Sequence, residues 1–265
     1  MKILSNEPVN PLSGLLRIGL WQVATTLILS MVSFSLTAQP LKITTVDIVP
    51  GGFVGKNGRP AGMFYDVANK IAETAKVPYL NVLKPYARVV KDLESGEADI
   101  TLLVSNPNLE GKVIKVAPIF TDKNVLVGKP SLNIRSFEDL HGKKVAIIRG
   151  VIYSTKFELD KNINKVEVNN YRQSVGLFLK GRVDAIIGPT LPLGHELNNY
   201  GYDWDDLGTP YVISSKQIWL FMSNKSNMKN MVNKLSDSVS LLHRNGGIEE
   251  IVFKYTGKNN AVTFY

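Results

Sequence analysis

Several aromatic and polar side chains stand where a small-molecule site would need them, at predicted helix starts or directly after predicted strands. The segment "PYAR" places Tyr86 and Arg88 at the start of a short predicted helix. A guanidinium can pair with an anionic group, and a tyrosine ring can stack on a ligand. The alternatives are that Tyr86 packs within its own domain and that Arg88 bonds a neighbouring carboxylate.

A second group of candidates follows the next predicted strand and the first glycine-rich loop. Ser105, Asn106 and Glu110 come after the strand "ADITLLV". Glu110 can meet a cation, or it is a solvated loop glutamate. Phe53 lies in the loop from Gly51 to Gly62, where it either lines one wall of the site or covers the core.

Motifs for catalysis and metal binding are missing from the sequence. The chain has no cysteine, which excludes a disulfide framework, a thiolate metal site, a cysteine nucleophile and a lipid-modified cysteine. The histidines His141, His195 and His243 are far apart and lack metal-ligand spacing. No Ser/His/Asp set or paired-carboxylate motif is visible. We therefore expect a protein that is not an enzyme and that needs no metal and no cofactor.

Composition is that of a globular protein with a basic surface. The chain has 265 residues, of which 44% are hydrophobic and 20% charged, and its net charge is +8. This length allows one large domain or two smaller ones with real cores. The lysines are scattered rather than gathered in a stripe, which indicates a solvated basic surface and no nucleic-acid partner.

Residues 1–38 have the pattern of a secretory signal peptide. Their charges are few, and the stretch "IGLWQVATTLILSMVSFSLTA" ends in small residues at Ala38. We expect cleavage near Gln39 and a periplasmic protein that is not a lipoprotein. The alternative is an uncleaved membrane anchor, since the apolar stretch is nearly long enough to span a bilayer.

The elements that must position the candidate residues alternate between strand and helix, twice. The first series is strand 41–49, helix 64–75, strand 79–83, helix 85–96 and strand 98–104; the second is strand 143–148, helix 153–160, strand 165–170, helix 172–181 and strand 183–187. Such a series predicts parallel sheets covered by helices. A strand at 218–222 and two amphipathic helices, beginning near Met228 and Ile248, follow.

The two series share a detail that we interpret as structural. In "GEADITLL" and in "GRVDAIIG" a glycine, Gly96 or Gly181, ends a helix and an aspartate stands just before a buried strand. Glycine takes the left-handed cap, and the aspartate can bond loop amides.

In their order and spacing these segments resemble family 3 of the bacterial extracellular solute-binding proteins. The segments that carry the resemblance are "NGRPAGMFYDVANKIA", "LESGEADI", "APIFTDKNVLVGK", "SFEDLHGKKVAIIRG", "LKGRVDAIIG" and "LHRNGGIEEIVFKYTG". The resemblance implies an α/β fold of the type II periplasmic binding protein kind, with two α/β lobes, two hinge crossings near 120–128 and 216–222, and a ligand cleft between the lobes. Lobe 1 would comprise 39–122 and 220–265, and lobe 2 would comprise 123–219.

Amino acid binders of this family usually anchor their ligand with an arginine after the third strand, a hydroxyl and backbone amides at a helix start in lobe 2, and an aspartate after the last strand of lobe 2. This sequence departs from each of these. Glu110 stands near the arginine position, "RGVIYS" puts Val151 and Ile152 at the helix start, and Pro189 stands near the aspartate position. These departures argue against an ordinary α-amino acid as the ligand. The candidates that the resemblance adds in lobe 2 are Gly150, Tyr153 and Thr190.

We therefore expect a monomeric periplasmic protein that captures a small polar ligand, amino-acid-like or an organic ion, by hinge closure and delivers it to an inner-membrane ABC permease. One alternative is a sensing subunit that presents the ligand to a membrane receptor. The other is a dehydratase-type enzyme on the same fold, for which Glu110 near Arg88 would be the proton-transfer pair.

Overall fold

The computed structural model describes residues 39–105, 109–258 and 262–265. The predicted signal peptide and Asn106 therefore lie outside the described residues. The chain divides into two units, and the second of them, Pro40–Tyr265, holds all the helices and strands described below. In this described part of the chain no helix is long and apolar enough to cross a bilayer.

The first half of this unit alternates strand and helix as the sequence predicts. The elements are β1 (Leu41–Val46), β2 (Phe53–Val54), β3 (Pro60–Ala61), α2 (Met63–Thr74), β4 (Tyr79–Lys84), α3 (Tyr86–Ser95), β5 (Ile100–Val104) and the long strand β6 (Val113–Gly128). Helix α2 forms because its apolar residues recur at helical spacing, and this face is fully buried. Helix α3 ends at Gly96, whose φ of 85° is the left-handed cap that the sequence predicts.

The second half repeats the alternation and adds helices at its end. The elements are η2 (Glu138–Leu140), β7 (Lys144–Ile148), α4 (Thr155–Leu159), β8 (Asn164–Val168), α5 (Tyr171–Leu179), β9 (Ala185–Pro189), α6 (Thr190–Asn199), η3 (Trp204–Asp206), β10 (Tyr211–Ser223), η4 (Lys229–Met231), α7 (Val232–Arg244) and α8 (Gly247–Thr256). The sequence pattern predicts each α-helix of this half except α6.

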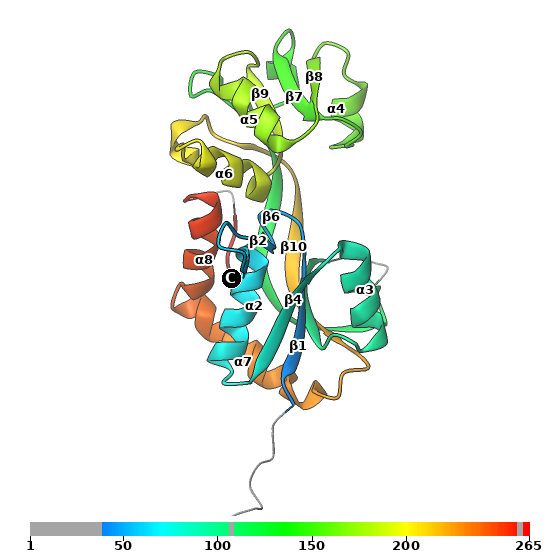
Figure 1. Cartoon of the computed structure of the whole chain (residues 1–265). Helices are drawn as coiled ribbons and strands as arrows, with labels where there is room; N and C mark the ends of the chain where they lie inside the picture. The colour runs from blue at the N-terminus through cyan, green and yellow to red at the C-terminus, as the bar shows by residue number, and fades with distance from the viewer. Residues whose placement is uncertain (1–38, 106–108, 259–261) are drawn as a thin grey trace, which may run out of the picture. The chain divides into compact units, whose positions relative to one another are not determined.

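One eight-stranded sheet, ordered β4-β1-β5-β10-β6-β9-β7-β8, runs through both lobes (Figure 1). Strands β4, β1 and β5 are parallel, as are β7, β8 and β9. β10 is antiparallel to both β5 and β6, and β6 is antiparallel to β9. The two parallel groups therefore run in opposite directions, and their carboxyl ends point toward each other. This is the architecture of the predicted fold class, with two α/β lobes and a cleft between them.

Two long strands connect the lobes. β10 pairs with β5 through residues 218–222, and β6 pairs with β9 through residues 124–128. Between these stretches, residues 121–123 of β6 pair with residues 215–217 of β10. Residues 121–123 of this two-stranded ribbon lie within the predicted crossing near 120–128. Residues 215–217 overlap the beginning of the predicted crossing near 216–222.

Each lobe has its own hydrophobic core. The core clusters of lobe 1 draw on the beginning and end of the chain, with Ile43, Ile100 and Val252 fully buried. Those of lobe 2 draw on the middle, with Val125, Phe157 and Ile186 fully buried. Each Å² of buried apolar surface stabilises the folded state by roughly 25 cal/mol, so each core stabilises its own lobe.

Helix α6 makes a further contact between the lobes. It packs against α8, and Leu191 in its first turn joins the core cluster of lobe 1. The ring of His195 bonds the Tyr255 carbonyl oxygen through Nδ1 at 3.0 Å. The lobes therefore touch through a packed helix pair as well as through the ribbon, so any closure must pivot about both.

Candidate ligand-binding cleft

The carboxyl ends of the strands position most of the predicted site residues. Tyr86 is the first residue of α3, directly after β4, and its side chain is exposed. Arg88 lies two residues further along and is also exposed. Open α/β sheets bind ligands at this edge, so both residues stand at the side of lobe 1 that faces lobe 2.

Arg88 is already engaged with a neighbouring carboxylate. Its Nε lies 3.1 Å from Oδ1 of Asp92, one turn along α3. Asp92 is almost fully buried and also accepts a hydrogen bond from Nζ of Lys84. A buried carboxylate between two cations is a stable arrangement. The guanidinium of Arg88 therefore holds Asp92 in this structure, which is the alternative that the sequence left open.

Ser105 and Glu110 come together at one pocket. They line a cavity of about 470 Å³, whose other lining residues are Leu109, Gly111, Val113, Lys115 and Phe221. All of these residues belong to lobe 1 or to its ends of β6 and β10. The backbone N–H of Ser105 donates to Gln217 at 3.0 Å, so the start of this loop is tied to β10 while its hydroxyl is exposed.

The loop after β7 carries the lobe 2 candidates. Gly150 has a φ of 76° and stands in open space, so it is exposed at the carboxyl end of β7. Tyr153 is buried, and its hydroxyl accepts the N–H of Ile148 at 3.1 Å. Ser154 accepts the N–H of Phe157 and caps α4. The polar groups of Tyr153 and Ser154 therefore hold the loop itself.

Thr190 reveals a group that the sequence analysis missed. It is fully buried directly after β9, and its hydroxyl donates to Oδ1 of Asp122 at 2.6 Å. The N–H of Leu191 donates to the same oxygen at 3.3 Å. Asp122, on the ribbon, thus occupies the N-terminus of α6, where the helix dipole favours an anion. Its carboxylate lies beside Pro189, the position near which the family resemblance led us to expect an aspartate.

Burial dominates the chemistry of Asp122. Removal from water raises the pKa of its carboxyl from 3.8 to about 6, although the hydrogen bonds from Thr190 and Leu191 act in the opposite direction. Burial likewise raises the pKa of Tyr171, whose hydroxyl interacts with that of Tyr153 and with the charge of Asp122. A polar chain therefore runs from the ribbon to the loop after β7. The sequence offers no signal for it, because Asp122 and Thr190 are 68 residues apart.

Phe53 packs rather than standing free. Its ring meets that of Tyr255 edge-on at 6.1 Å and lies 6.4 Å from the ring of His195. The side chain is half-buried against the core of lobe 1. Of the two interpretations of Phe53, packing on the core fits this geometry, and the residue also sits at the contact between α6 and α8.

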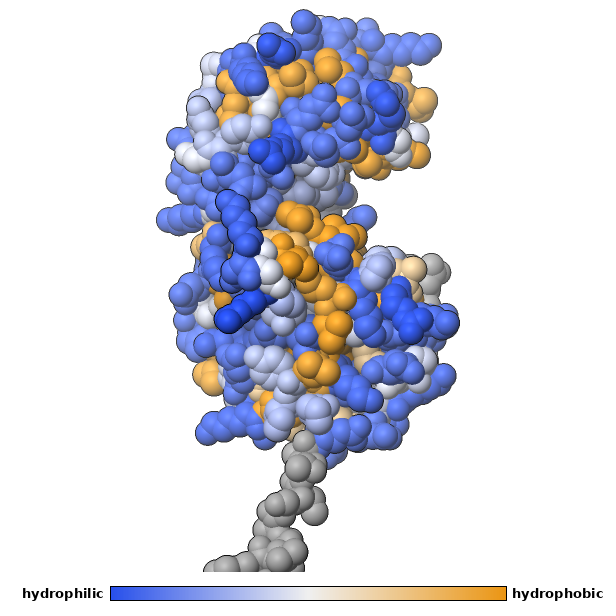
Figure 2. Space-filling model, viewed as in Figure 1, coloured by the Kyte–Doolittle hydropathy of each residue, from blue (hydrophilic) through white to orange (hydrophobic). Residues whose placement is uncertain are grey.

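The same strand ends expose apolar side chains. In lobe 1 these are Ile48 and Val49 after β1 and Val104 at the end of β5; in lobe 2 they are Val151 and Ile152 after β7. Ile152 is 81% exposed. Figure 2 shows apolar side chains gathered on the face that carries β4, where Leu80 and Val82 are also exposed.

Comparison with known proteins gives a single family. The sequence profile of the bacterial extracellular solute-binding proteins, family 3, matches residues 41–258. A protein of Shewanella frigidimarina named as a sensor is 25% identical over 76% of this chain. YxeM of Bacillus subtilis, named as an amino-acid-binding protein, is 20% identical over 78% of this chain and 80% of its own length. The chain spans 30% of the length of the Shewanella protein.

Solved structures agree on the fold. The substrate-binding protein of a polar amino acid ABC uptake transporter from Streptococcus thermophilus superposes with a TM-score of 0.70, covering 82% of this chain and 86% of that one. Its sequence is 19% identical. The two-lobed architecture derived above from the strand directions is therefore shared with the Streptococcus thermophilus protein.

Proposed function

Because the chain belongs to the bacterial extracellular solute-binding proteins of family 3, we propose that it captures a small organic ligand between its lobes and closes on it by bending at the ribbon. The observation that carries this proposal is the opposed direction of the two parallel strand groups. Two sets of strand ends then face one cleft, and the described links between the lobes include the ribbon of residues 121–123 and 215–217 and the contact of α6 with α8. Hinged closure around a ligand is the expected behaviour of such an arrangement.

The same proposal includes the protein's setting. We place the lobe boundaries near residues 122 and 220, which the separate core clusters support. A cleaved signal peptide, a periplasmic location, a monomeric state and delivery of the ligand to an inner-membrane ABC permease complete it. The ligand would be amino-acid-like or an organic ion. The exposed candidate contacts include Tyr86, Ser105 and Gly150 at carboxyl ends of strands and Glu110 in the loop before β6.

Small-angle scattering tests hinge closure directly. The mature protein, beginning near Gln39, is first screened against a library of amines, amino acids and organic acids by thermal shift. A compound that raises the melting temperature should also reduce the radius of gyration at saturation. A stabilising compound that leaves the scattering profile unchanged would contradict a hinge-bending clamp.

A sensing role is the second candidate, and the similarity to the Shewanella protein favours it. In that role the closed, ligand-bound form would be read by a membrane receptor rather than by a permease. Reconstitution distinguishes the two. If the protein serves transport, its ligand-loaded form should stimulate the ATPase activity of a permease encoded by a neighbouring gene, reconstituted in proteoliposomes. If it serves sensing, it should bind a receptor domain and leave that ATPase activity unchanged.

A further inference from the structure

Apolar side chains are exposed at the strand ends on both sides of the cleft. Ile48, Val49 and Val104 are exposed on the lobe 1 side, and Val151 and Ile152 on the lobe 2 side. Each follows or ends a strand at its carboxyl end. Exposed apolar groups gathered at one place mark a binding surface, because water contact there has a free-energy cost that a ligand can relieve.

Position distinguishes these residues from other exposed apolar side chains. Leu159, which is 74% exposed, stands at the C-terminal end of α4 and Leu241 stands on α7, away from the strand ends. Single exposed leucines of that kind are ordinary. Apolar side chains on both faces of the cleft can instead contact the two sides of one ligand when the lobes approach.

The arginines that follow β4 and β7 are already paired with carboxylates of the protein. Arg88 holds Asp92, and Nε of Arg149 lies 3.0 Å from Oε2 of Glu167. Binding a ligand carboxylate at either guanidinium would require it to leave or share its present partner. The polar chain of lobe 2 likewise ends in hydroxyls that hold the protein itself, as with Tyr153 and Ile148.

Asp122 is the complementary case, an anion that lacks a cation. Among the residues that the structure describes, Asp122 takes part in no ion pair, even though Lys216 is its cross-strand partner on β10. The residue is half-buried, and Thr190 and Leu191 at the carboxyl end of β9 orient its carboxylate. A desolvated carboxylate gains most from a positively charged partner.

We infer that the ligand is a small organic cation with an apolar body, held by its charged group at Asp122 and covered by the apolar side chains of both lobes. This inference rests on the proposed function, since it names the ligand class of that same cleft. It predicts a preference for amines over the corresponding α-amino acids, because a carboxylate would enter the closed cleft without a partner.

Matched probes separate the contributions of the charge and of the apolar body. Calorimetry on the mature protein would compare 2-phenylethylamine and isopentylamine with L-phenylalanine and L-leucine, which add a carboxylate. Ethanolamine keeps the ammonium group but lacks the apolar body, and 3-phenylpropionate keeps the apolar body but carries an anion in place of the cation. We expect the two apolar amines to bind at least tenfold more tightly than any of the other four.

Variants then test the two contacts. Asp122→Asn should weaken 2-phenylethylamine binding at least tenfold, and Ile152→Ser at least threefold. Leu159→Ser is the matched control for Ile152→Ser, because it makes the same kind of change at an equally exposed site in the same lobe, and it should bind like the wild type. Circular dichroism confirms that each variant is folded, and the exposed Ile152 provides a second test that is independent of Asp122.

Each contrary result has a distinct meaning. If L-phenylalanine or ethanolamine binds as tightly as 2-phenylethylamine, the inference that the ligand is an apolar cation is wrong. It is also wrong if neither 2-phenylethylamine nor isopentylamine binds. Tight binding of a polar amino acid with compaction in scattering would overturn the ligand class and leave the clamp function standing. Absence of compaction with every solute of the library would overturn both.

Discussion

Asp99 accepts the backbone N–H of Lys42 through Oδ2 at 2.8 Å, and its own N–H donates to the Lys42 carbonyl at 2.8 Å. Asp184 and Lys144 form the same pair in lobe 2, with both distances again 2.8 Å. In each lobe the aspartate before one strand therefore fastens the beginning of another, β1 to β5 and β7 to β9. The structure thus confirms the structural interpretation of the repeated glycine and aspartate, with the reciprocal pair as its physical cause.

Because it is more buried, Asp99 should contribute more to the free energy of unfolding than the equivalent Asp184. Asp99 is 6% exposed and also accepts the hydroxyl of Ser226, whereas Asp184 is exposed. Asp99→Ala should lower the free energy of unfolding by about 2–3 kcal/mol, because buried donors lose a charged acceptor. Asp184→Ala should cost less than about 1 kcal/mol, since water can replace the carboxylate. Urea denaturation measures both, and equal losses would contradict the role of burial.

Asp122 should make the folded protein less stable as the pH rises. Its pKa is raised from 3.8 to about 6 in the folded state, so between these values the folded state binds more protons than the unfolded state. The contribution of this residue to stability therefore falls as the pH rises from about 4 to 6. Asp122→Asn should raise the free energy of unfolding by about 1–2 kcal/mol at pH 8 and change it little at pH 4.

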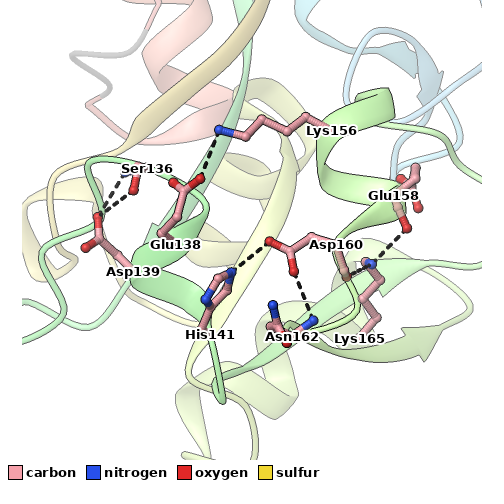
Figure 3. A network of polar contacts seen from close by, with 9 residues as sticks. All are labelled: Ser136, Glu138, Asp139, His141, Lys156, Glu158, Asp160, Asn162 and Lys165. Carbon is pink, nitrogen blue, oxygen red and sulfur yellow. Dashed lines mark hydrogen bonds and ion pairs between the residues drawn. The ribbon is translucent and has the colours of Figure 1, made fainter.

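Asp139 provides a control of opposite sign. It accepts the N–H of Ser136 at 2.9 Å (Figure 3) and the N–H of Arg135 at 2.8 Å, and these bonds lower its pKa. Its stabilising contribution is present at neutral pH and is lost as the pH falls through its titration. Asp139→Asn should therefore destabilise the protein at pH 8 and have less effect at low pH. Melting temperatures of both variants at the two pH values that fail to diverge in this way would show that burial does not govern Asp122.

Gly194 should be essential to the contact between α6 and α8. A Cβ at this position would lie 2.6 Å from the Thr256 carbonyl oxygen and 2.8 Å from Nε1 of Trp204. Gly194→Ala should therefore lower stability by about 2–3 kcal/mol through overpacking, despite the better helix propensity of alanine. In Gly176→Ala the nearest atom is instead the hydroxyl of the exposed Tyr200, at 3.0 Å. That side chain can move, so this control should be neutral or stabilising, and a similar loss in both variants would refute the explanation.

The contrast between α6 and the other helices shows what the sequence could and could not predict. Helices such as α2 and α7 bury one apolar face each, so periodicity predicts them. Helix α6 contains Pro192 and Gly194, which are usually breaking signals. It forms because Pro192 stands in the first turn, where no intrahelical N–H is needed, and because Gly194 permits close packing. That second reason lies in tertiary contacts, which the sequence pattern does not display.

The candidate site divides in the same way. The order of strands and helices along the chain predicts that Tyr86, Ser105 and Gly150 lie at carboxyl ends of strands, because each residue closely follows a predicted strand. The partners of these residues depend on the three-dimensional arrangement. Asp92 as the partner of Arg88 is a local helix contact that the sequence could suggest. The pairing of Asp122 with Thr190 arises only because the ribbon passes the start of α6.

Tyr86 and Arg88 should matter to ligand binding more than to folding. Tyr86 is 45% exposed, and the core face of α3 is carried by Val89 and Leu93. When Arg88 is lost, Asp92 keeps its bond to Lys84, so Arg88→Ala should cost less than about 0.5 kcal/mol of stability, as exposed helix pairs do. Tyr86→Ala should nevertheless weaken binding of the compound that compacts the protein by about 1–3 kcal/mol, the range for a lost stack, and Arg88→Ala should do the same where that compound has an acceptor for the guanidinium.

Asp92→Ala is the matched stability control for this pair. It removes the buried member and leaves the Lys84 ammonium without its carboxylate, so it should lower the free energy of unfolding by about 2–3 kcal/mol. Calorimetry for affinity and urea denaturation for stability would be run on all three variants. If Tyr86→Ala and Arg88→Ala both bind like the wild type, the ligand does not approach α3, and the binding surface must lie closer to β9 and the loop after β7.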